Sequence, residues 1–226
     1  MANFFTKEVS QSYDERNSKL TPISGNMHFL IRLVLKELPA RARVLCVGVG
    51  TGAEILSLAS ANPEWTFVGV DPSDSMLEVC RERLKEAGFL SRCELIHGFV
   101  QDLPGGEQYD AAVSVLVSHF VKREERQEFF RQIVSRVLKG GYFVNTEISV
   151  DLDAAEFPSL LKNWEQVQTL MGATPESLAA LPKQMREALT VLPPSEVERV
   201  MRQSGVAMPI RFYQAFLISG WYGKKA

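Results

Sequence analysis

Cysteines are scarce in this chain, and their placement excludes two classes of protein. There are three in 226 residues, Cys46, Cys80 and Cys93, and none stands in C-x-x-C spacing. An odd, unspaced set argues against a disulfide framework and against a zinc cluster. We therefore expect no metal site and a reducing, cytoplasmic setting.

Long apolar runs and an excess of basic residues are also missing. No window approaches the roughly 20 apolar residues of a membrane span, and residues 1–20 carry charges without the apolar core of a signal peptide. Lys and Arg number 25 against 27 Asp and Glu, which gives a net charge of −2. That balance argues against a domain built mainly to grip nucleic acid. The 46% of hydrophobic residues predicts a globular chain with a sizeable core.

What the sequence does contain is a regular alternation of apolar runs and helical patterns. Short apolar runs predict strands buried on both faces; they are RVLCVGV, WTFVGVD, CELIHG, YDAAVSVLV and YFVNTEISV. The helices expected between them are AEILSLASA, a segment from Pro72-Ser73 to Gly88, and REERQEFFRQIVSRVL, which stops at Gly140-Gly141. This alternation predicts an α/β fold with a parallel sheet covered by helices on both faces.

The two ends of the chain depart from that alternation. About residues 5–38 read as two helices broken at Ser24-Gly25-Asn26, and AMPIRFYQAFLISGWYG predicts a closing hairpin at the sheet edge. Residues 151–205 read as helices, and the breaks expected in them are Gly172, Pro182 and Pro193-Pro194. We expect one domain over residues 1–226, made of a helical cap (1–38), a cofactor-binding core (40–150), a helical lid (151–192), and a last helix with the hairpin (193–226).

Residues 151–192 form a longer segment than a simple crossover between strands needs. They carry Trp164, Met171 and Met185 among helical patterns. Two compatible interpretations follow: an extra helical layer that closes the core, or a lid over a ligand pocket.

Three glycines at alternate positions follow the first predicted strand, in VLCVGVGTGAE. A ligand in an open α/β sheet binds at the carboxyl ends of the strands, near the switch in strand order. There Gly48 would permit a tight turn, Gly50 would let a ligand approach the backbone, and Gly52 would open the next helix. Backbone N–H groups at such a helix start favour anionic or strongly polar groups. Taken alone, a glycine-rich turn is weak evidence, because it is also ordinary turn chemistry.

The second predicted strand supplies a partner for that turn. It ends in Asp71, 23 positions after Gly48. A carboxylate there can accept two hydrogen bonds from a ribose diol; its alternative role is an N-cap before Pro72 and the following helix. Strand, glycine turn, helix, strand and acid together predict an adenosine-type cofactor.

NAD and S-adenosylmethionine both carry adenosine, and the rest of the sequence distinguishes them. The spacing is G-x-G-x-G instead of the dinucleotide G-x-G-x-x-G, and no substrate domain or Tyr/Lys proton relay for hydride transfer is evident. The ordered segments VLCVGVGTGAE, FVGVDPSDSML, HGFVQDLP, YDAAVSVLVSHF and LKGGYFV resemble the motifs of class I S-adenosylmethionine-dependent methyltransferases. The resemblance covers residues 40–148, and IRFYQAFLISGWYG resembles that family's closing hairpin.

The resemblance implies a Rossmann-like fold: a mostly parallel seven-stranded sheet, helices on both faces and a C-terminal antiparallel hairpin. It also implies a methyltransferase with S-adenosylmethionine as cofactor and S-adenosylhomocysteine as product. Gly48, Gly50 and Gly52 would surround the methionine part and nearby ribose, and Asp71 would hold the ribose hydroxyls. Thr51 is also implied to bind the cofactor. The other implied cofactor-binding residues are Pro72 and Met76 by the adenine, Val100 and Gln101 at its edge, and Val115 at the methionine end.

Two positions depart from the family pattern. Many relatives have Asp or Glu where this chain has Cys46, and an acid where it has Phe99. The first change removes a carboxylate near the glycine turn, and the second removes an acceptor for the adenine amino group. Gln101 or Asp102 could compensate, or Asp102 could be only a loop residue. These losses leave room for a protein that binds the cofactor without turnover.

Methyl transfer from a sulfonium is an in-line displacement, in which positioning supplies on the order of 7–11 kcal/mol. A base is needed only where the acceptor must first lose a proton. His119, after the fourth predicted strand, could act as that base near neutral pH or pack as a structural histidine. Tyr13, in SQSYDERN, could cover the cofactor or be a surface helix tyrosine.

The acceptor is left unidentified, and a small molecule is expected. FTKEVSQSYDERNSKLTPISGNMHFL and the hairpin also resemble carboxy-S-adenosylmethionine synthases of tRNA wobble-uridine modification, which alkylate the cofactor through prephenate chemistry. That family grips the added carboxylate with an arginine in the later helical segment. Lys183 and Arg186 lie in the comparable region here, where they could equally be solvated helix charges. Monomer and homodimer both stay open, and the apolar hairpin is expected in the core instead of at a dimer edge.

Overall fold

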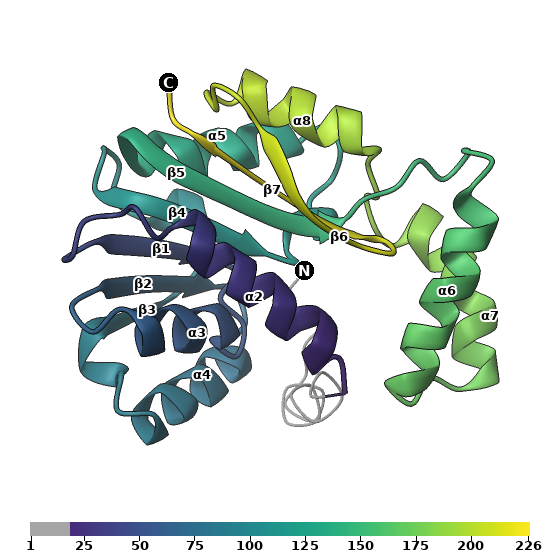
Figure 1. Ribbon diagram of the computed structural model, residues 1–226, viewed down its shortest axis with the longest axis horizontal. Helices are drawn as coiled ribbons and strands as arrows, with labels where there is room; N and C mark the ends of the chain where they lie inside the picture. The colour runs from purple at the N-terminus through teal and green to yellow at the C-terminus, as the bar shows by residue number, and fades with distance from the viewer. Residues whose placement is uncertain (1–18) are drawn as a thin grey trace.

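A seven-stranded sheet organises the chain (Figure 1), and the structure, a computed structural model, describes residues 19–226. The strand order is β3-β2-β1-β4-β5-β7-β6. Neighbours run parallel except β7, which is antiparallel to both β5 and β6. The strands are β1 Arg43–Val47, β2 Thr66–Asp71, β3 Cys93–His97, β4 Tyr109–Val115, β5 Val137–Ile148, β6 Ile210–Ala215 and β7 Ile218–Lys224. The predicted fold class, including the hairpin at the sheet edge, is confirmed.

Helices cover both faces of this sheet because its strands are apolar on both sides. On one face, α2 Thr21–Val34, α3 Ala53–Ala61 and α4 Asp74–Glu86 pack against alternate strand residues such as Val44 and Val113. On the other, α5 Arg126–Arg136 and α8 Pro194–Gln203 pack against the intervening residues such as Leu45 and Ala112. Successive side chains of a strand point to opposite faces, which explains the continuous apolar runs in the sequence.

A pair of helices stands apart from these two layers. α6 Phe157–Leu170 and α7 Pro175–Glu187 lie side by side at the right of Figure 1, beyond the carboxyl end of β5. The chain enters α6 from β5 and leaves α7 into α8. We call residues 157–187 the helical pair.

Three sequence-based boundaries are wrong. α2 runs through Ser24-Gly25-Asn26, where Ser24 Oγ donates to the Leu20 carbonyl at 3.1 Å and a single glycine weakens a helix by only about 1 kcal/mol. α7 likewise runs through Pro182 without a break. The other expected N-terminal helix falls largely on residues outside the described part of the chain.

The third boundary concerns the two glycines before the fifth strand. α5 ends at Arg136, and β5 already begins at Val137, so Gly140-Gly141 lie inside the strand. A Cβ on Gly141 would come within 2.6 Å of the Asp110 carbonyl. The register between β4 and β5 also shifts between Tyr109 and Ala111. These glycines therefore allow β5 to approach β4 closely at a β-bulge, and they do not end a helix.

The C-terminal hairpin belongs to the core, as expected. Trp221 is fully buried, and its indole Nε1 donates to Glu198 Oε1 on α8 at 3.2 Å. Tyr213 is buried too, and its hydroxyl donates to the Ile23 carbonyl on α2 at 3.0 Å. Among the described helices, none has both the length and the apolar character to cross a bilayer.

Candidate functional site

The strand order reverses between β1 and β4. From β1 the chain steps outward to β2 and β3, then returns to place β4 on the other side of β1. The loops that follow these two strands therefore diverge at the carboxyl edge of the sheet, the usual position of a ligand site in such folds. Here the loops are the glycine turn, residues 48–52, and the segment 116–120 after β4.

All three alternate glycines of the turn adopt positive φ, and they do so for different reasons. A Cβ on Gly48 (φ +67°) would meet Val117 Cγ2 at 2.4 Å, and one on Gly52 (φ +81°) would meet Cys80 Sγ at 2.6 Å. Gly50 (φ +50°) has no such neighbour within 4 Å. Gly48 and Gly52 thus permit close packing, whereas Gly50 presents bare backbone to open space, as a ligand approaching the chain requires.

Asp71 at the end of β2 points back to this turn. Its Oδ2 accepts from the Gly50 N–H at 2.8 Å, and its Oδ1 accepts from the Ser73 N–H at 2.9 Å. Burial raises the pKa of the carboxyl, and the two N–H donors oppose that shift. A carboxylate offers about four acceptor positions, so each oxygen keeps capacity for a ligand hydroxyl. The N-cap of α4 is Ser73, whose Oγ accepts from the Met76 N–H at 3.4 Å.

The residues predicted near the adenine lie at the start of α4 and in the turn after β3. Met76 and Val100 are buried, and Gln101 is exposed. Phe99 is 41% exposed. Asp102 Oδ2 accepts from the Phe99 N–H at 2.8 Å, which gives this carboxylate a loop-capping role. The contacts of these side chains with a cofactor stay a prediction.

Sequence reasoning missed a buried carboxyl directly after the glycine turn. Glu54, in the first turn of α3, is 5% exposed, and within the described structure its Oε1 has no hydrogen-bond partner. Burial, together with the charge of Asp71, raises its pKa to about 8, so the group is mostly neutral at pH 7. Its position on the same helical face as buried Leu58 was the available signal.

The segment after β4 forms the opposite wall. Leu116 adopts φ +57°, a strained conformation for a residue with a branched side chain, and Val117 packs against Gly48. His119 is 4% exposed, and its Nδ1 accepts from the Ile148 N–H at 3.3 Å. Burial, reinforced by Arg126, lowers the pKa of His119 to about 3. The ring is therefore neutral at physiological pH and a weak base. Tyr13 lies outside the described residues.

A buried polar network supports this wall, and no local sequence pattern predicts it. Arg126 and Glu147 form an ion pair in which both side chains are fully buried. Asn145 Nδ2 donates to Glu147 Oε1 at 3.2 Å, and Ser118 Oγ donates to Asn145 Oδ1 at 2.9 Å. The partner of Glu147 is thus a cation from α5 and not a second acid.

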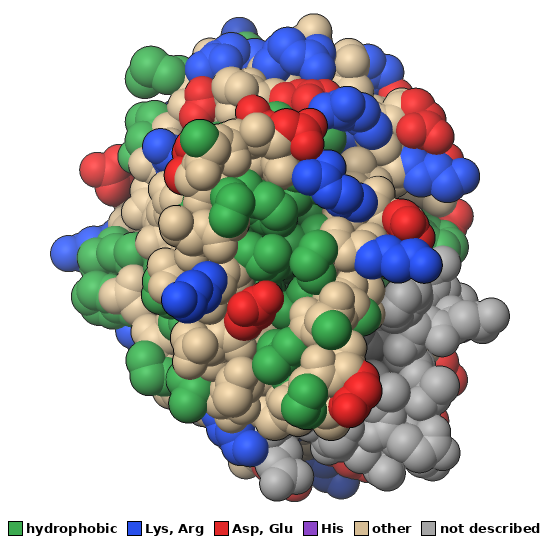
Figure 2. All heavy atoms as spheres, turned by 90° about the vertical axis from the view of Figure 1, so that its right-hand side faces the viewer, with side chains coloured by type: hydrophobic (Ala, Val, Ile, Leu, Met, Phe, Trp, Pro, Cys, Tyr) green, Lys and Arg blue, Asp and Glu red, His purple; other side chains and the backbone are tan. Residues whose placement is uncertain are grey.

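The face of the molecule on the side of the helical pair is apolar at its centre. Figure 2 views the molecule from the side of the helical pair, and hydrophobic side chains gather in the middle with charged groups mostly around them. Four side chains of the pair are nevertheless buried, Phe157, Trp164, Val167 and Met185. All four belong to the same hydrophobic cluster as the core under α2 and α3.

Comparison with known proteins gives the class that this geometry defines. Residues 44–141 match the family model described as a methyltransferase domain. A carboxy-S-adenosyl-L-methionine synthase of Campylobacter fetus is 26% identical over 197 residues, covering 86% of this chain and 81% of the relative. A second such synthase, from Yersinia pseudotuberculosis, is 28% identical over 134 residues, covering 58% of this chain and 56% of the relative.

Solved structures show the same fold at low identity. An O-methyltransferase family protein of Burkholderia thailandensis superposes with a TM-score of 0.70 at 15% identity, covering 96% of this chain and 59% of that one. PigF with SAH gives a TM-score of 0.59 at 20% identity, with 81% and 50% covered. The chain thus spans little more than half the length of these structural neighbours. Its fold is that of the class I S-adenosylmethionine-dependent methyltransferases, and residues 44–141 carry the match to a methyltransferase domain.

The residues present fit the cofactor of that class. Gly50 leaves space that any side chain would fill, and Asp71 presents a carboxylate fixed by the same turn. An adenosyl ribose carries hydroxyl donors for such an acceptor, while the methionine carboxylate suits the N–H groups at a helix start. S-adenosylmethionine is therefore the cofactor of this enzyme.

Proposed function

We propose that this enzyme methylates a small, largely apolar acceptor held beneath the helical pair. The observation that carries the proposal is the burial of Trp164 and Met185, which turns an apolar side of the pair toward the protein beyond β5. Because burying an unpaired charge is costly, an uncharged organic molecule suits such a surface best. The three cysteines, all free, fit a reducing, cytoplasmic setting.

Two of the three cations of the helical pair, Lys183 and Arg186, support methyl transfer over carboxylation of the cofactor. Arg186 donates to Asp153 Oδ1 at 3.1 Å and to the Leu152 carbonyl at 2.9 Å, and Lys183 pairs with Glu187 at 3.8 Å. All four charged side chains are roughly half exposed or more. A carboxylated cofactor would need a cation aimed at its added negative group, and these two are engaged at the surface.

The chain's own residues would act through position. When bound, S-adenosylmethionine supplies a methyl group on a positively charged sulfur. Asp71 and the glycine turn would fix the adenosyl end, while Val115 and Leu116 would bound the reacting end. Holding the two reactants in line supplies on the order of 7–11 kcal/mol. His119 is a weak base, so the best acceptor is one whose reacting atom is already nucleophilic at neutral pH.

The second candidate function is synthesis of carboxy-S-adenosylmethionine. The names of the curated relatives favour it, and one of these relatives aligns over most of the chain. It differs from methyl transfer in its products: the cofactor would gain a carboxyl group, and no acceptor would be methylated.

A product assay distinguishes the two candidates. Purified protein is incubated with S-adenosylmethionine and either a panel of phenols, amines and carboxylic acids or prephenate, and the products are separated by liquid chromatography with mass detection. Methyl transfer predicts S-adenosylhomocysteine together with one methylated panel member. Carboxylated cofactor in the prephenate reaction, with no methylated product in any other, would contradict the proposal. Asp71→Ala serves as the impaired variant, and Asp74→Ala, an exposed acid on α4, as its matched control.

A further inference from the structure

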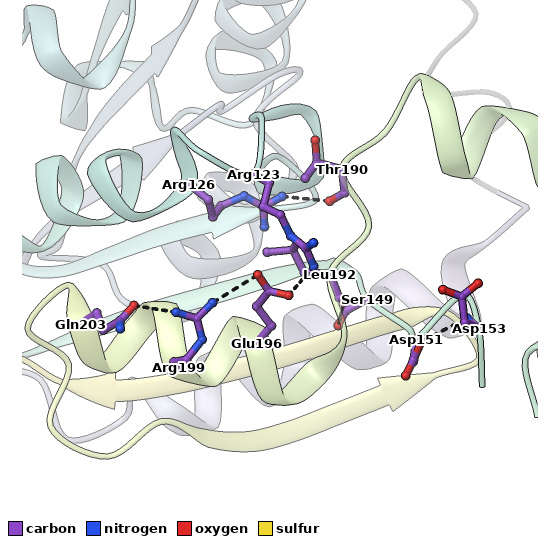
Figure 3. A network of polar contacts seen from close by, with 10 residues as sticks. All are labelled: Arg123, Arg126, Ser149, Asp151, Asp153, Thr190, Leu192, Glu196, Arg199 and Gln203. Atoms are coloured by element: carbon purple, nitrogen blue, oxygen red, sulfur yellow. Dashed lines mark hydrogen bonds and ion pairs between the residues drawn. The ribbon is translucent and has the colours of Figure 1, made fainter.

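The two chain segments that connect the helical pair to the sheet meet at one point. The outgoing leg, residues 149–156, leaves β5, and the returning leg, residues 188–193, leads into α8. Ser149 Oγ donates to the Leu192 carbonyl at 2.7 Å, and the two residues form a parallel β-bridge. The outgoing and returning legs are therefore joined to each other directly after the end of β5, as Figure 3 shows from close by.

Arg126 joins this point to the end of β5. One guanidinium nitrogen, Nη1, pairs with Glu147, and the other, Nη2, donates to the Thr190 carbonyl at 3.0 Å and to the Val121 carbonyl at 3.4 Å. The fork thus binds strand and returning leg at once. A buried ion pair contributes little net stability compared with apolar packing of equal volume, whereas a rigid fork fixes geometry.

His119 touches both legs from the other side. Its Nδ1 accepts from the Ile148 N–H where the outgoing leg begins, and its backbone carbonyl accepts from the Thr190 N–H at 2.8 Å. Two residues earlier, Val117 packs on Gly48 of the glycine turn. A short chain of contacts therefore runs from the cofactor turn to the base of the helical pair.

A second set of ion pairs holds the far end of the returning leg. Glu196, in the first turn of α8, bridges Arg123 and Arg199, the latter at 3.2 Å. Arg199 also donates to Gln203 Oε1 at 3.0 Å. Figure 3 shows these side chains below the Arg126–Thr190 contact, with the returning leg between the two sets. The leg is anchored on both sides.

We propose that Arg126 is a positioning residue: by tying Thr190 to the end of β5, it sets where the helical pair stands over the carboxyl edge of the sheet. This inference rests on the proposed function only in that the pair covers the acceptor. A purely structural ion pair would need just one nitrogen facing Glu147. The positioning role needs the second nitrogen, which lysine lacks.

Arg126→Lys separates these two roles. The variant keeps a cation for Glu147 and loses the donor to Thr190. We expect hydrogen–deuterium exchange in residues 150–190 to rise about tenfold, the factor for one lost charged hydrogen bond in a local opening, with core strands β1 and β4 unchanged. Arg131→Lys on the same helix is the control, because Arg131 is half exposed and pairs with Glu128 on the surface. The affinity for S-adenosylhomocysteine, measured by calorimetry, should change little in either variant.

Trp164 provides an independent optical signal. Of the three tryptophans, Trp65 and Trp221 lie in the sheet core, and Trp164 alone lies on the helical pair. A shift of the emission to longer wavelength in Arg126→Lys, absent in Arg131→Lys, would support the inference. Unchanged exchange and emission in a folded Arg126→Lys protein would overturn it, and so would exchange that rises equally in the core strands.

A second variant keeps the test open if Arg126→Lys does not fold. Ser149→Ala removes the bond to the Leu192 carbonyl and leaves the ion pair intact. Hydrogen–deuterium exchange in residues 150–190 should rise in the same way, and exchange equal to that of the native protein would count against the inference. Neither readout requires turnover, so a failure of the proposed methyl transfer is distinguishable from a failure of this inference.

Discussion

The backbone N–H of Gly50 donates to Asp71 Oδ2 across 2.8 Å and so joins the turn after β1 to the end of β2. The same carboxylate accepts from Ser73 at the start of α4. Two loops that belong to successive strands are therefore held in one arrangement by the protein's own hydrogen bonds. Such preorganisation lowers the ordering cost that binding would otherwise carry.

Asp71→Asn should weaken binding of S-adenosylmethionine. The amide offers one oxygen in place of two and turns an NH2 group toward a backbone N–H. A hydrogen bond to a charged group contributes about 1.5–3 kcal/mol, which corresponds to an affinity loss of roughly 10- to 150-fold. Titration calorimetry measures it. Asp74→Asn, an exposed acid three residues away, should bind like the native protein; equal losses in both variants would argue against a ribose site at Asp71.

Alanine substitutions in the glycine turn should distinguish Gly52, which permits close packing, from Gly50, which leaves the backbone accessible to a ligand. Both Gly50→Ala and Gly52→Ala carry the strain of a left-handed backbone, about 1–2 kcal/mol. Gly52→Ala adds a clash with Cys80 Sγ at 2.6 Å, so its melting temperature should fall further. Gly50→Ala should remain folded and lose cofactor affinity instead.

The double variant Gly52→Ala/Cys80→Ala tests the packing argument. Removing the sulfur should restore part of the lost stability, measured by thermal unfolding without ligand. No recovery in the double variant would mean that the clash is not the cause. If Gly50→Ala binds S-adenosylmethionine as tightly as the native protein, the cofactor does not approach the backbone there.

Glu54 should make stability depend on pH. Its pKa rises from 4.5 to about 8 on folding, so between these values the folded state holds a proton that the unfolded state has lost. Stability from this group is therefore complete below pH 4.5 and declines until about pH 8. Glu54→Gln removes the ionisation. Its stability relative to the native protein should improve by up to a few kcal/mol from acid to mildly alkaline pH, measured by denaturant unfolding. A difference that stays constant with pH would contradict the assigned shift.

Trp164→Ala should impair turnover more than cofactor binding. Trp164 is buried on the helical pair, and truncating it opens the apolar surface proposed to hold the acceptor. With any acceptor found in the panel, kcat/KM should fall while the affinity for S-adenosylmethionine stays within about threefold of native, under 1 kcal/mol. Leu170→Ala on the same helix is the control, because Leu170 is 66% exposed. A native rate in Trp164→Ala would remove the pair from acceptor binding.

The sequence predicted the strands and helices around the glycine turn well, because these elements follow from local rules. Apolar runs followed by turn residues predicted the strands, and AEILSLASA coincides with α3. The glycine turn and Asp71 lie on consecutive strand ends, and consecutive parallel strands separated by one helix are neighbours in space. The pairing of Gly50 with Asp71 was therefore within reach of a motif argument.

The acceptor side depends on contacts that no local pattern reveals. Arg126 and Glu147 are 21 positions apart, and Arg126 reaches Thr190 across 64 positions. Charged residues are usually exposed, so nothing marked this pair as buried. His119 was a candidate base because it follows the fourth predicted strand, and only its burial beside Arg126 gives the depressed pKa. The glycines inside β5 were misread because a close strand crossing and a helix stop use the same residue.

A crystal structure of the protein with S-adenosylhomocysteine tests the central claim most directly. The account predicts the ribose hydroxyls on the Asp71 carboxylate and the ligand backbone against Gly50, with the thioether facing the segment after β4. A ligand bound elsewhere, or Asp71 retaining only its bonds to Gly50 and Ser73 while the ribose lies on other groups, would contradict it.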